Sequence, residues 1–227
     1  MPFNQLPGLI SIAFSNPFAF IIIAVILLGA ITIHEFAHAF IADRLGDPTP
    51  RLQGRVTLNP LAHLDPVGTL MLVFIGFGWG KPVEFDPYNL KQPVRDTALI
   101  AIAGPASNLI LAAILAVLIP TLINMAPATG QLLYFILSTS IFYNCMLAIF
   151  NLLPLHPLDG GKILSSLLPA TTAIEYDRFM YRYGHLVLLA LIVPWNGMSP
   201  LSAIISPPIS ITASLFMNLA AVILKLG

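Results

Sequence analysis

The sequence predicts an all-α polytopic membrane protein with about five transmembrane helices, and three observations support this fold class. First, 57% of the 227 residues are hydrophobic and only 9% are charged, whereas a soluble domain carries about 25% charged residues. Second, four apolar runs are each long enough to cross the hydrocarbon layer, which takes about 20 residues. Third, the basic residues gather in only some of the connections between these runs.

The four long apolar runs cover residues 18–42, 97–125, 132–155 and 203–224. A shorter run at 184–195 ends with Pro194 and Trp195, and we expect it to form the fifth span. The apolar run 68–78, between the first two spans, has only eleven residues, and this length predicts a re-entrant segment. The β-forming residues at 55–58 predict a small membrane-associated β element in the same connection.

Basic residues predict how the chain is oriented in the membrane. Those between the first and second long runs are Arg44, Arg51, Arg55, Lys81, Lys91 and Arg95, and those after the third run are Lys162, Arg178 and Arg182. The first 17 residues and the connection at 126–131 contain none. Because basic loops stay on the cytoplasmic side, we expect a multi-pass protein of the inner or plasma membrane with its N-terminus outside.

Composition argues against several classes of protein. Cys145 is the single cysteine, so a disulfide framework within the chain is excluded and a cysteine-based metal site is not favoured. The net charge is zero, and no basic surface indicates nucleic acid as a partner. We find no internal repeat or low-complexity tract, and we expect one domain over residues 1–227.

The first apolar run contains the sequence His34-Glu35-Phe36-Ala37-His38. Histidines four positions apart lie on one face of a helix, one turn from each other, where they can share a metal ion. Glu35 is next to His34 and can reach a water molecule at that metal. An ionisable residue buried in hydrocarbon is costly, so such residues generally have a function. The run predicts a metal site inside a spanning helix.

A catalytic zinc site needs three protein ligands and one open position. The candidates for the third ligand are His63, His156, His185 and several carboxylates. Asp159 is favoured because it follows the third long run in the sequence N-L-L-P-L-H-P-L-D-G-G. The prolines end the helix there, and the glycines allow close approach of the backbone. The two histidines and Asp159 are also expected at a similar depth, near the inner ends of their spans.

The sequence resembles the site-2 protease family of intramembrane zinc metalloproteases. The H-E-F-A-H run matches the metal-binding helix of that family, and the N-x-x-P-x-x-x-L-D-G-G run matches its second signature. The segments Gly46-Asp47-Pro48-Thr49, 54–68, 78–83 and Ala103-Gly104-Pro105-Ala106-Ser107-Asn108 resemble its compact prokaryotic branch, and we find no inserted PDZ domain or CBS domains. The resemblance covers most of residues 30–165. We therefore expect a catalytic core at about 17–168 and C-terminal helices at about 184–225.

The resemblance implies hydrolysis of a peptide bond within or near a substrate transmembrane helix, close to the cytoplasmic face. It makes His34, His38 and Asp159 the ligands of one Zn²⁺ per chain, and it makes Glu35 the general base for a zinc-activated water. Asn151 matches an asparagine that helps to hold the substrate or the oxyanion. The implied partners are the lipid bilayer and the transmembrane segment of a membrane-anchored protein substrate. The run that resembles the edge strand for unfolded substrate is Trp79, Gly80, Lys81, Pro82 and Val83.

Three other polar residues near these motifs keep more than one interpretation. The resembling branch usually has proline at the position of His156, which is therefore an alternative ligand, a group that supports the ligands, or neither. His63 and Asp65 lie beside Pro60 and Pro66, where they either fix a turn or support the site.

Two other functions fit parts of the pattern. A metal-binding transporter is disfavoured because no repeat is visible and the polar residues gather at one depth. A catalytically silent relative is disfavoured because Glu35 is intact.

Overall fold

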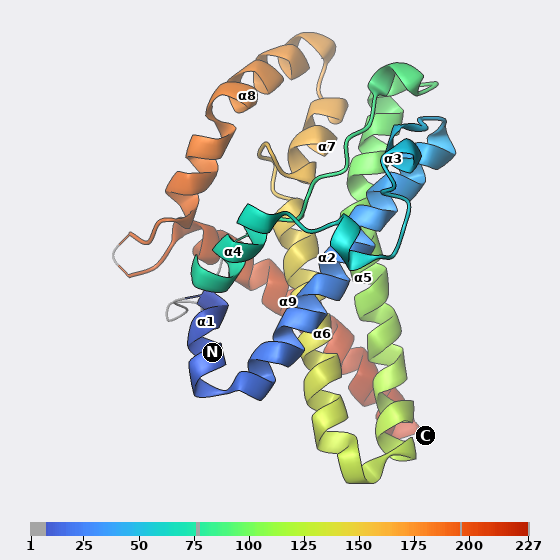
Figure 1. The fold of residues 1–227 in the computed structure, drawn as a ribbon, viewed down its shortest axis with the longest axis vertical. Coiled ribbons are helices and arrows are strands. Elements are labelled where there is room, and N and C mark those ends of the chain that lie inside the picture. The colour runs from blue at the N-terminus through green and yellow to red at the C-terminus, as the bar shows by residue number, and fades with distance from the viewer. Residues whose placement is uncertain (1–7, 76–77, 196, 227) are drawn as a thin grey trace.

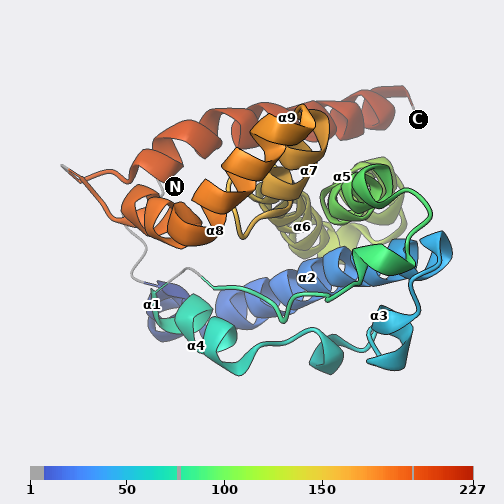
Figure 2. The ribbon, with the colours of Figure 1, turned by 90° about the horizontal axis from the view of Figure 1, so that it is seen from above.

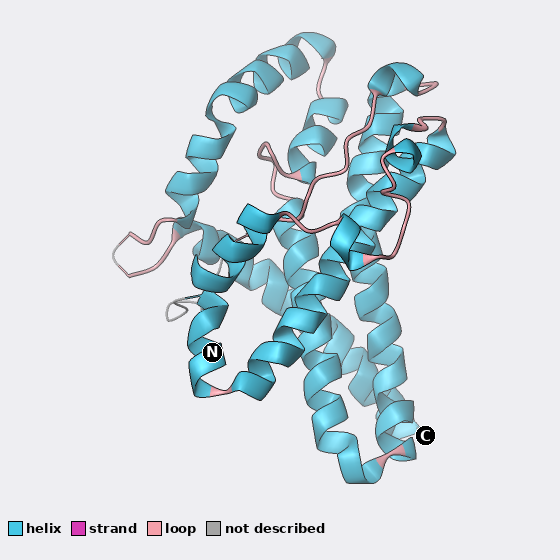
Figure 3. Cartoon of the chain, viewed as in Figure 1, coloured by secondary structure: helices cyan, strands magenta, loops and turns pink. Residues whose placement is uncertain are grey.

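The computed structural model describes residues 8–75, 78–195 and 197–226 as a helical bundle (Figures 1 and 3). The helices in chain order are α1 (Gly8–Ser15), α2 (Pro17–Leu45), α3 (Thr49–Leu52), η2 (Pro60–Ala62), α4 (Pro66–Ile75), η3 (Pro87–Asn89), α5 (Pro93–Met125), η4 (Pro127–Thr129), α6 (Gly130–Asn151), α7 (Asp159–Leu167), α8 (Ala170–Ile192) and α9 (Pro200–Leu226). The helices labelled η are single 3₁₀ turns.

Within the described residues, four helices are long and apolar enough to cross a membrane: α2, α5, α6 and α9. The predicted all-α membrane class is confirmed, but the predicted count of about five spans is not. The run expected as the fifth span is the last part of α8. The part of α8 before Gly184 contains Glu175, Asp177, Arg178 and Arg182, so the apolar part of this helix is too short to cross the hydrocarbon.

Local sequence explains where the first span begins and ends. The Asn16 side chain accepts a hydrogen bond from the Ala19 N–H, and Pro17 occupies the first turn of α2. Both are favoured at helix starts, since the first N–H groups of a helix have no partner inside it. At the other end, Gly46 has φ of +113°, a left-handed conformation that glycine adopts readily. The chain can therefore turn sharply just after the helix that contains the metal motif.

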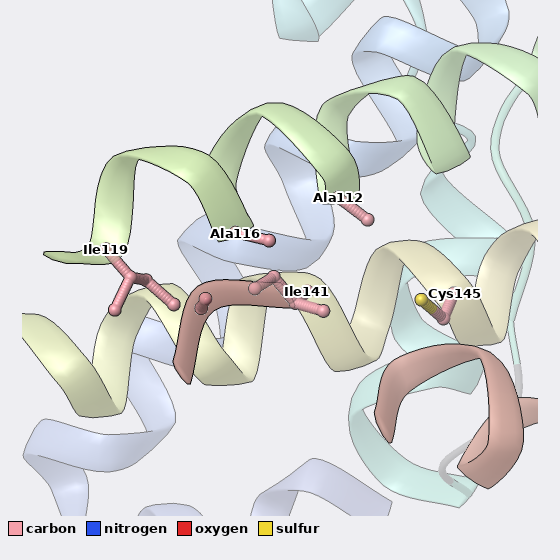
Figure 4. Packing of buried hydrophobic residues seen from close by; sticks show 6 residues of the cluster. Ala112, Ala116, Ile119, Ile141 and Cys145 are labelled. Carbon is pink, nitrogen blue, oxygen red and sulfur yellow. The ribbon is translucent and has the colours of Figure 1, made fainter. Parts of the chain in front are cut away.

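The core of the bundle lies between α5, α6 and α9. Figure 4 shows Ala112, Ala116 and Ile119 of α5 facing Ile141 and Cys145 of α6. Ala220 of α9 belongs to the same cluster. Alanines at such a contact let helix backbones approach closely, which favours helix association in lipid. These contacts hold α5, α6 and α9 together.

Viewed from above, the molecule is layered (Figure 2). The helix α9 lies on one side, α5, α6 and α7 lie in the middle, and α2 follows. The segment with α3 and α4 covers the outer face of α2. The start of α9 packs on the end of α6, so α9 runs antiparallel to α6. The C-terminal end of the chain therefore lies near the α5–α6 connection (Figure 1).

The connection between α2 and α5 contains no strand in its described part, so the predicted β element is not confirmed. A single antiparallel bridge joins Leu64 to Gly80, and Pro82 lacks the N–H that a longer ladder would need. The run predicted to be re-entrant forms α4, which packs against α1. Ten residues of helix extend about 15 Å, too short to cross. Residues 76 and 77, at the end of that run, lie outside the described part.

Asp47 fastens this connection to the end of α2. Its side chain is fully buried, and its carboxylate accepts hydrogen bonds from the Thr49 hydroxyl (2.6 Å), the Asp86 N–H (2.7 Å) and the Asn89 amide (2.8 Å). Burial alone would raise the pKa of Asp47, but these hydrogen bonds hold it below its ordinary value. The segment that follows Val83 is thereby tied to the helix that contains the metal motif.

Candidate metal centre

The structure brings His34 and His38 of α2 together with Asp159 at the start of α7. Oδ2 of Asp159 lies 3.1 Å from Nε2 of His34 and 3.2 Å from Nε2 of His38. The three residues are buried, and their candidate ligand atoms all lie within 4.8 Å of one another. Ligand atoms about 2.0–2.1 Å from a tetrahedral zinc ion are separated by about 3.3 Å. The group therefore has the donor types and the spacing that one zinc ion needs.

Gly104 of α5 packs directly against the two imidazoles. A Cβ atom built at Gly104 would lie 2.3 Å from Nε2 of His38 and 2.6 Å from Nε2 of His34. Those separations are far shorter than a carbon–nitrogen contact allows, so any side chain at this position would displace the imidazoles. Glycine therefore lets α5 pack directly against the two rings that hold the candidate ligand nitrogens.

The remaining ring nitrogens have acceptor partners. Nδ1 of His38 lies 2.7 Å from the Ile100 carbonyl oxygen, and Nδ1 of His34 lies 2.7 Å from Oδ1 of Asn108. With each Nδ1–H donating to its oxygen, each Nε2 retains a lone pair on the side of Asp159. Metal-binding histidines are usually oriented in this way by a second hydrogen bond.

The loop after α6 explains why Asp159 reaches the histidines. Pro154 and Pro157 prevent α6 from continuing, and α7 begins at Asp159 itself. A Cβ at Gly160 would lie 2.3 Å from the carbonyl oxygens of Leu152 and Leu153, so only glycine lets the first turn of α7 sit on this loop. Burial alone would raise the pKa of Asp159, but the two imidazoles hold it well below its ordinary range.

Glu35 is half-buried beside the metal group and faces the connection between α2 and α5. Its Oε2 accepts a hydrogen bond from the Val83 N–H at 3.2 Å and lies 3.7 Å from Nη2 of Arg55. Arg55 is buried, and the same Nη2 donates to the carbonyl oxygen of Lys81. Arg55 therefore links the carboxylate of Glu35 to the extended run that passes it.

That run is the one predicted as a substrate edge strand, from Trp79 to Val83. The Lys81 N–H donates to the carbonyl oxygen of His63 at 2.8 Å, next to the bridge at Gly80. A Cβ at Gly80 would lie 3.7 Å from Oε1 of Glu35. The run is therefore extended, paired with the 63–64 turn and close to Glu35, although it forms no regular strand.

The other predicted site residues lie around this group without joining it. The Asn151 amide donates to the Leu147 carbonyl oxygen in its own helix. His63 is fully buried, with Nε2 2.8 Å from the Thr57 carbonyl oxygen. Asp65 accepts from the Gly68 N–H at the start of α4. Nε2 of His156 lies 3.3 Å from Oδ1 of Asp177 in α8.

Comparison with known proteins adds independent evidence. Residues 120–193, which include Asn151 and Asp159, match the model of "Peptidase family M50". A curated relative in Bacillus subtilis, YwhC, is 41% identical over 175 residues, which cover 75% of this chain and 80% of YwhC. The chain belongs to peptidase family M50. This membership confirms the resemblance to the site-2 proteases, the zinc metalloprotease class and zinc as the expected cofactor.

Two further relatives come from a mycobacterium and from Methanocaldococcus jannaschii. Rip2 of Mycolicibacterium smegmatis is 31% identical, with 77% of this chain and 67% of Rip2 covered. MJ0611 of Methanocaldococcus jannaschii is 29% identical, with 68% of this chain and 77% of MJ0611 covered. All three relatives are named "Putative zinc metalloprotease". No solved structure matches the chain.

Sequence reasoning assigned no role to Gly104, Asn108, Asn144 or Arg55, although each contacts the site or a residue that does. Gly104 and Asn108 lie in the A-G-P-A-S-N run, which resembles the family but by itself indicates no role for either residue. Asn108 and Asn144 are amides inside apolar spans, a signal that generally marks function or helix pairing. Gly104 carries no comparable signal, because its role depends on how α5 packs against α2.

Proposed function

We propose that this M50 protein is an intramembrane zinc metalloprotease. It hydrolyses a peptide bond within or near a transmembrane helix of a membrane-anchored protein, close to the cytoplasmic face. The observation that carries the proposal is the buried group of His34, His38 and Asp159, with Glu35 next to His34 on α2. Two imidazoles, one carboxylate and an adjacent glutamate are the donor set of a catalytic zinc site.

The chain's own groups would divide the work. Zinc, when bound, would activate a water molecule and polarise the carbonyl of the scissile bond. Glu35 would act as the general base that accepts a proton from water and returns it to the leaving amine. Asn151, at the end of α6, would offer its amide to the substrate or to the developing oxyanion. The Val83 N–H donates to the Glu35 carboxylate in this structure, and it would be released when that carboxylate accepts a proton.

Water has to reach this buried site, and we infer that it enters through a cavity beside Arg55. A cavity of about 360 Å³ is lined by Gln53, Arg55, Lys81, Pro82 and Glu84. Arg55 lines it and also lies near the Glu35 carboxylate. Irregular backbone at membrane depth is tolerated where it lines protein or water. The cavity therefore supports a supply of water from the basic side of the membrane, which the positive-inside rule makes cytoplasmic.

The extended run from Trp79 to Val83 suits capture of an unwound substrate. A helical peptide bond is shielded by its own hydrogen bonds, so the substrate has to become extended before it reacts. Main-chain hydrogen bonding to an extended edge is a general way to hold such a segment. In this proposal the catalytic core covers about residues 17–168, and the C-terminal helices pack on it, with the N-terminus outside.

Mapping the products tests intramembrane cleavage. The zinc-loaded full chain is reconstituted in liposomes with native single-span membrane proteins, and new peptide termini are identified by mass spectrometry. We expect new termini inside transmembrane segments, towards their cytoplasmic ends. New termini confined to soluble flanks, or their complete absence, would contradict the proposal.

A further inference from the structure

Two buried asparagines connect the metal group to the middle of the bundle. Asn108 of α5 and Asn144 of α6 are 0% and 1% exposed. The Asn144 amide donates to the Ser140 carbonyl oxygen at 2.9 Å, and Oδ1 of Asn144 accepts from the Asn108 amide at 2.8 Å. The Asn108 amide also donates to the Ala30 carbonyl oxygen at 3.0 Å. Oδ1 of Asn108 then lies 2.7 Å from Nδ1 of His34.

The direction of every hydrogen bond in this network is fixed by the two backbone carbonyl groups at its ends. The carbonyl oxygens of Ala30 and Ser140 can only accept, so each asparagine has to present its NH₂ group to them. Flipping Asn108 would put its oxygen against the oxygens of Ala30 and Asn144, which is unfavourable. Oδ1 of Asn108 is therefore left as an acceptor, and the proton of neutral His34 has to be on Nδ1.

We propose that Asn108 and Asn144 are positioning residues for zinc: they keep the proton of His34 on Nδ1 and its Nε2 lone pair free for the metal. The inference rests on the metal site of the proposed function and extends it to the residues that tune that site. His38 is oriented in the same way by the backbone carbonyl of Ile100, which no substitution removes. His34 is oriented by a side chain, so a substitution can test its orientation.

A purely structural role would leave one contact unexplained. Two paired asparagines between α5 and α6 can join helices in lipid without any third group. Here Oδ1 of Asn108 accepts a hydrogen bond from His34, and Nε2 of the same histidine lies 3.1 Å from Oδ2 of Asp159. Removing such an outer partner usually lowers metal affinity by about 10- to 100-fold.

The test measures zinc affinity of the purified full chain by competition with a chelator, together with the visible spectrum of cobalt(II) bound in place of zinc. Asn108→Leu should bind zinc about 10- to 100-fold more weakly and alter the cobalt spectrum. Asn108→Asp keeps an acceptor for the Nδ1–H of His34 and should recover most of the lost affinity. The control is Ser214→Ala, which removes an exposed hydrogen bond within α9 and should leave both readouts unchanged.

Melting of the zinc-free forms separates folding from zinc positioning. Wild-type affinity in a folded Asn108→Leu variant would overturn the inference. So would equally weak binding in Asn108→Leu and Asn108→Asp, because packing alone would then explain the loss. If Asn108→Leu does not fold, Asn144→Leu decides: weaker zinc binding supports the inference and unchanged binding contradicts it. None of these readouts uses cleavage, so failure of the proposed proteolysis is detected separately.

Discussion

The Gly104→Ala variant is expected to lose its zinc. The added Cβ would lie 2.3 Å from Nε2 of His38 and 2.6 Å from Nε2 of His34, so the imidazoles would have to move out of their ligand positions. Gly104 is buried on α5, so the methyl group cannot turn away without moving the helix. Zinc content after purification should fall from about one ion per chain to a small fraction of that, and cleavage should fall with it.

Gly29→Ala is the matched control for this result. Gly29 lies on α2, the helix that contains both histidines, and a Cβ added there meets nothing within 4 Å. It should therefore keep its zinc and its activity. If Gly104→Ala retained full zinc content with wild-type affinity, the close packing of α5 on the two imidazoles would not matter for the metal centre.

The Glu35→Gln variant should lose cleavage while it keeps zinc. Glutamine has nearly the same shape as glutamate and can still contact Arg55 and Val83, but it cannot accept a proton from water. Loss of a general base typically costs about 100- to 10,000-fold in rate. The rate of product formation in liposomes measures this loss, and zinc content measured on the same samples shows that the site is still occupied.

A matched neutralisation elsewhere shows whether charge alone is responsible. Glu175 is exposed on α8, and Glu175→Gln should cleave at the wild-type rate. Cleavage at the wild-type rate by Glu35→Gln would rule out Glu35 as the base. Transport or scaffolding that survives Glu35→Gln, with no cleavage by the wild type, would instead favour the non-enzymatic interpretations.

Much of the fold could be predicted because a helix that crosses the bilayer needs a long apolar run, which is visible in the sequence. The run predicted at 97–125 is part of α5, and the one at 18–42 is part of α2. The predicted fifth span is not confirmed, because the hydropathy of the run 184–195 does not reveal the helix to which it belongs. It continues the helix α8, whose earlier turns are charged. The predicted β element is not confirmed, because Pro60, Pro66 and Pro82 limit pairing to a single bridge.

The candidate site was predictable wherever spacing or a local break in the helix determines the geometry. Residues four positions apart lie on one face of a helix, as His34 and His38 do. Prolines and glycines mark the turn that places Asp159 near them. Arg55 and Asn108 could not be placed in this way, because their contacts depend on tertiary packing between segments distant in sequence. His156 shows the same limit. Its closeness to Asp159 in sequence left several roles open, and the structure places its Nε2 next to Asp177.

Zinc analysis of two variants, Asp159→Ala and His156→Ala, tests the central claim most directly. Only Asp159 has its carboxylate within 3.2 Å of the histidine Nε2 atoms among the carboxylates of the described segments. Wild type and His156→Ala should each hold about one zinc ion per chain, and Asp159→Ala should lose most of its zinc. Full zinc in Asp159→Ala, with loss in His156→Ala, would contradict the metal centre described here.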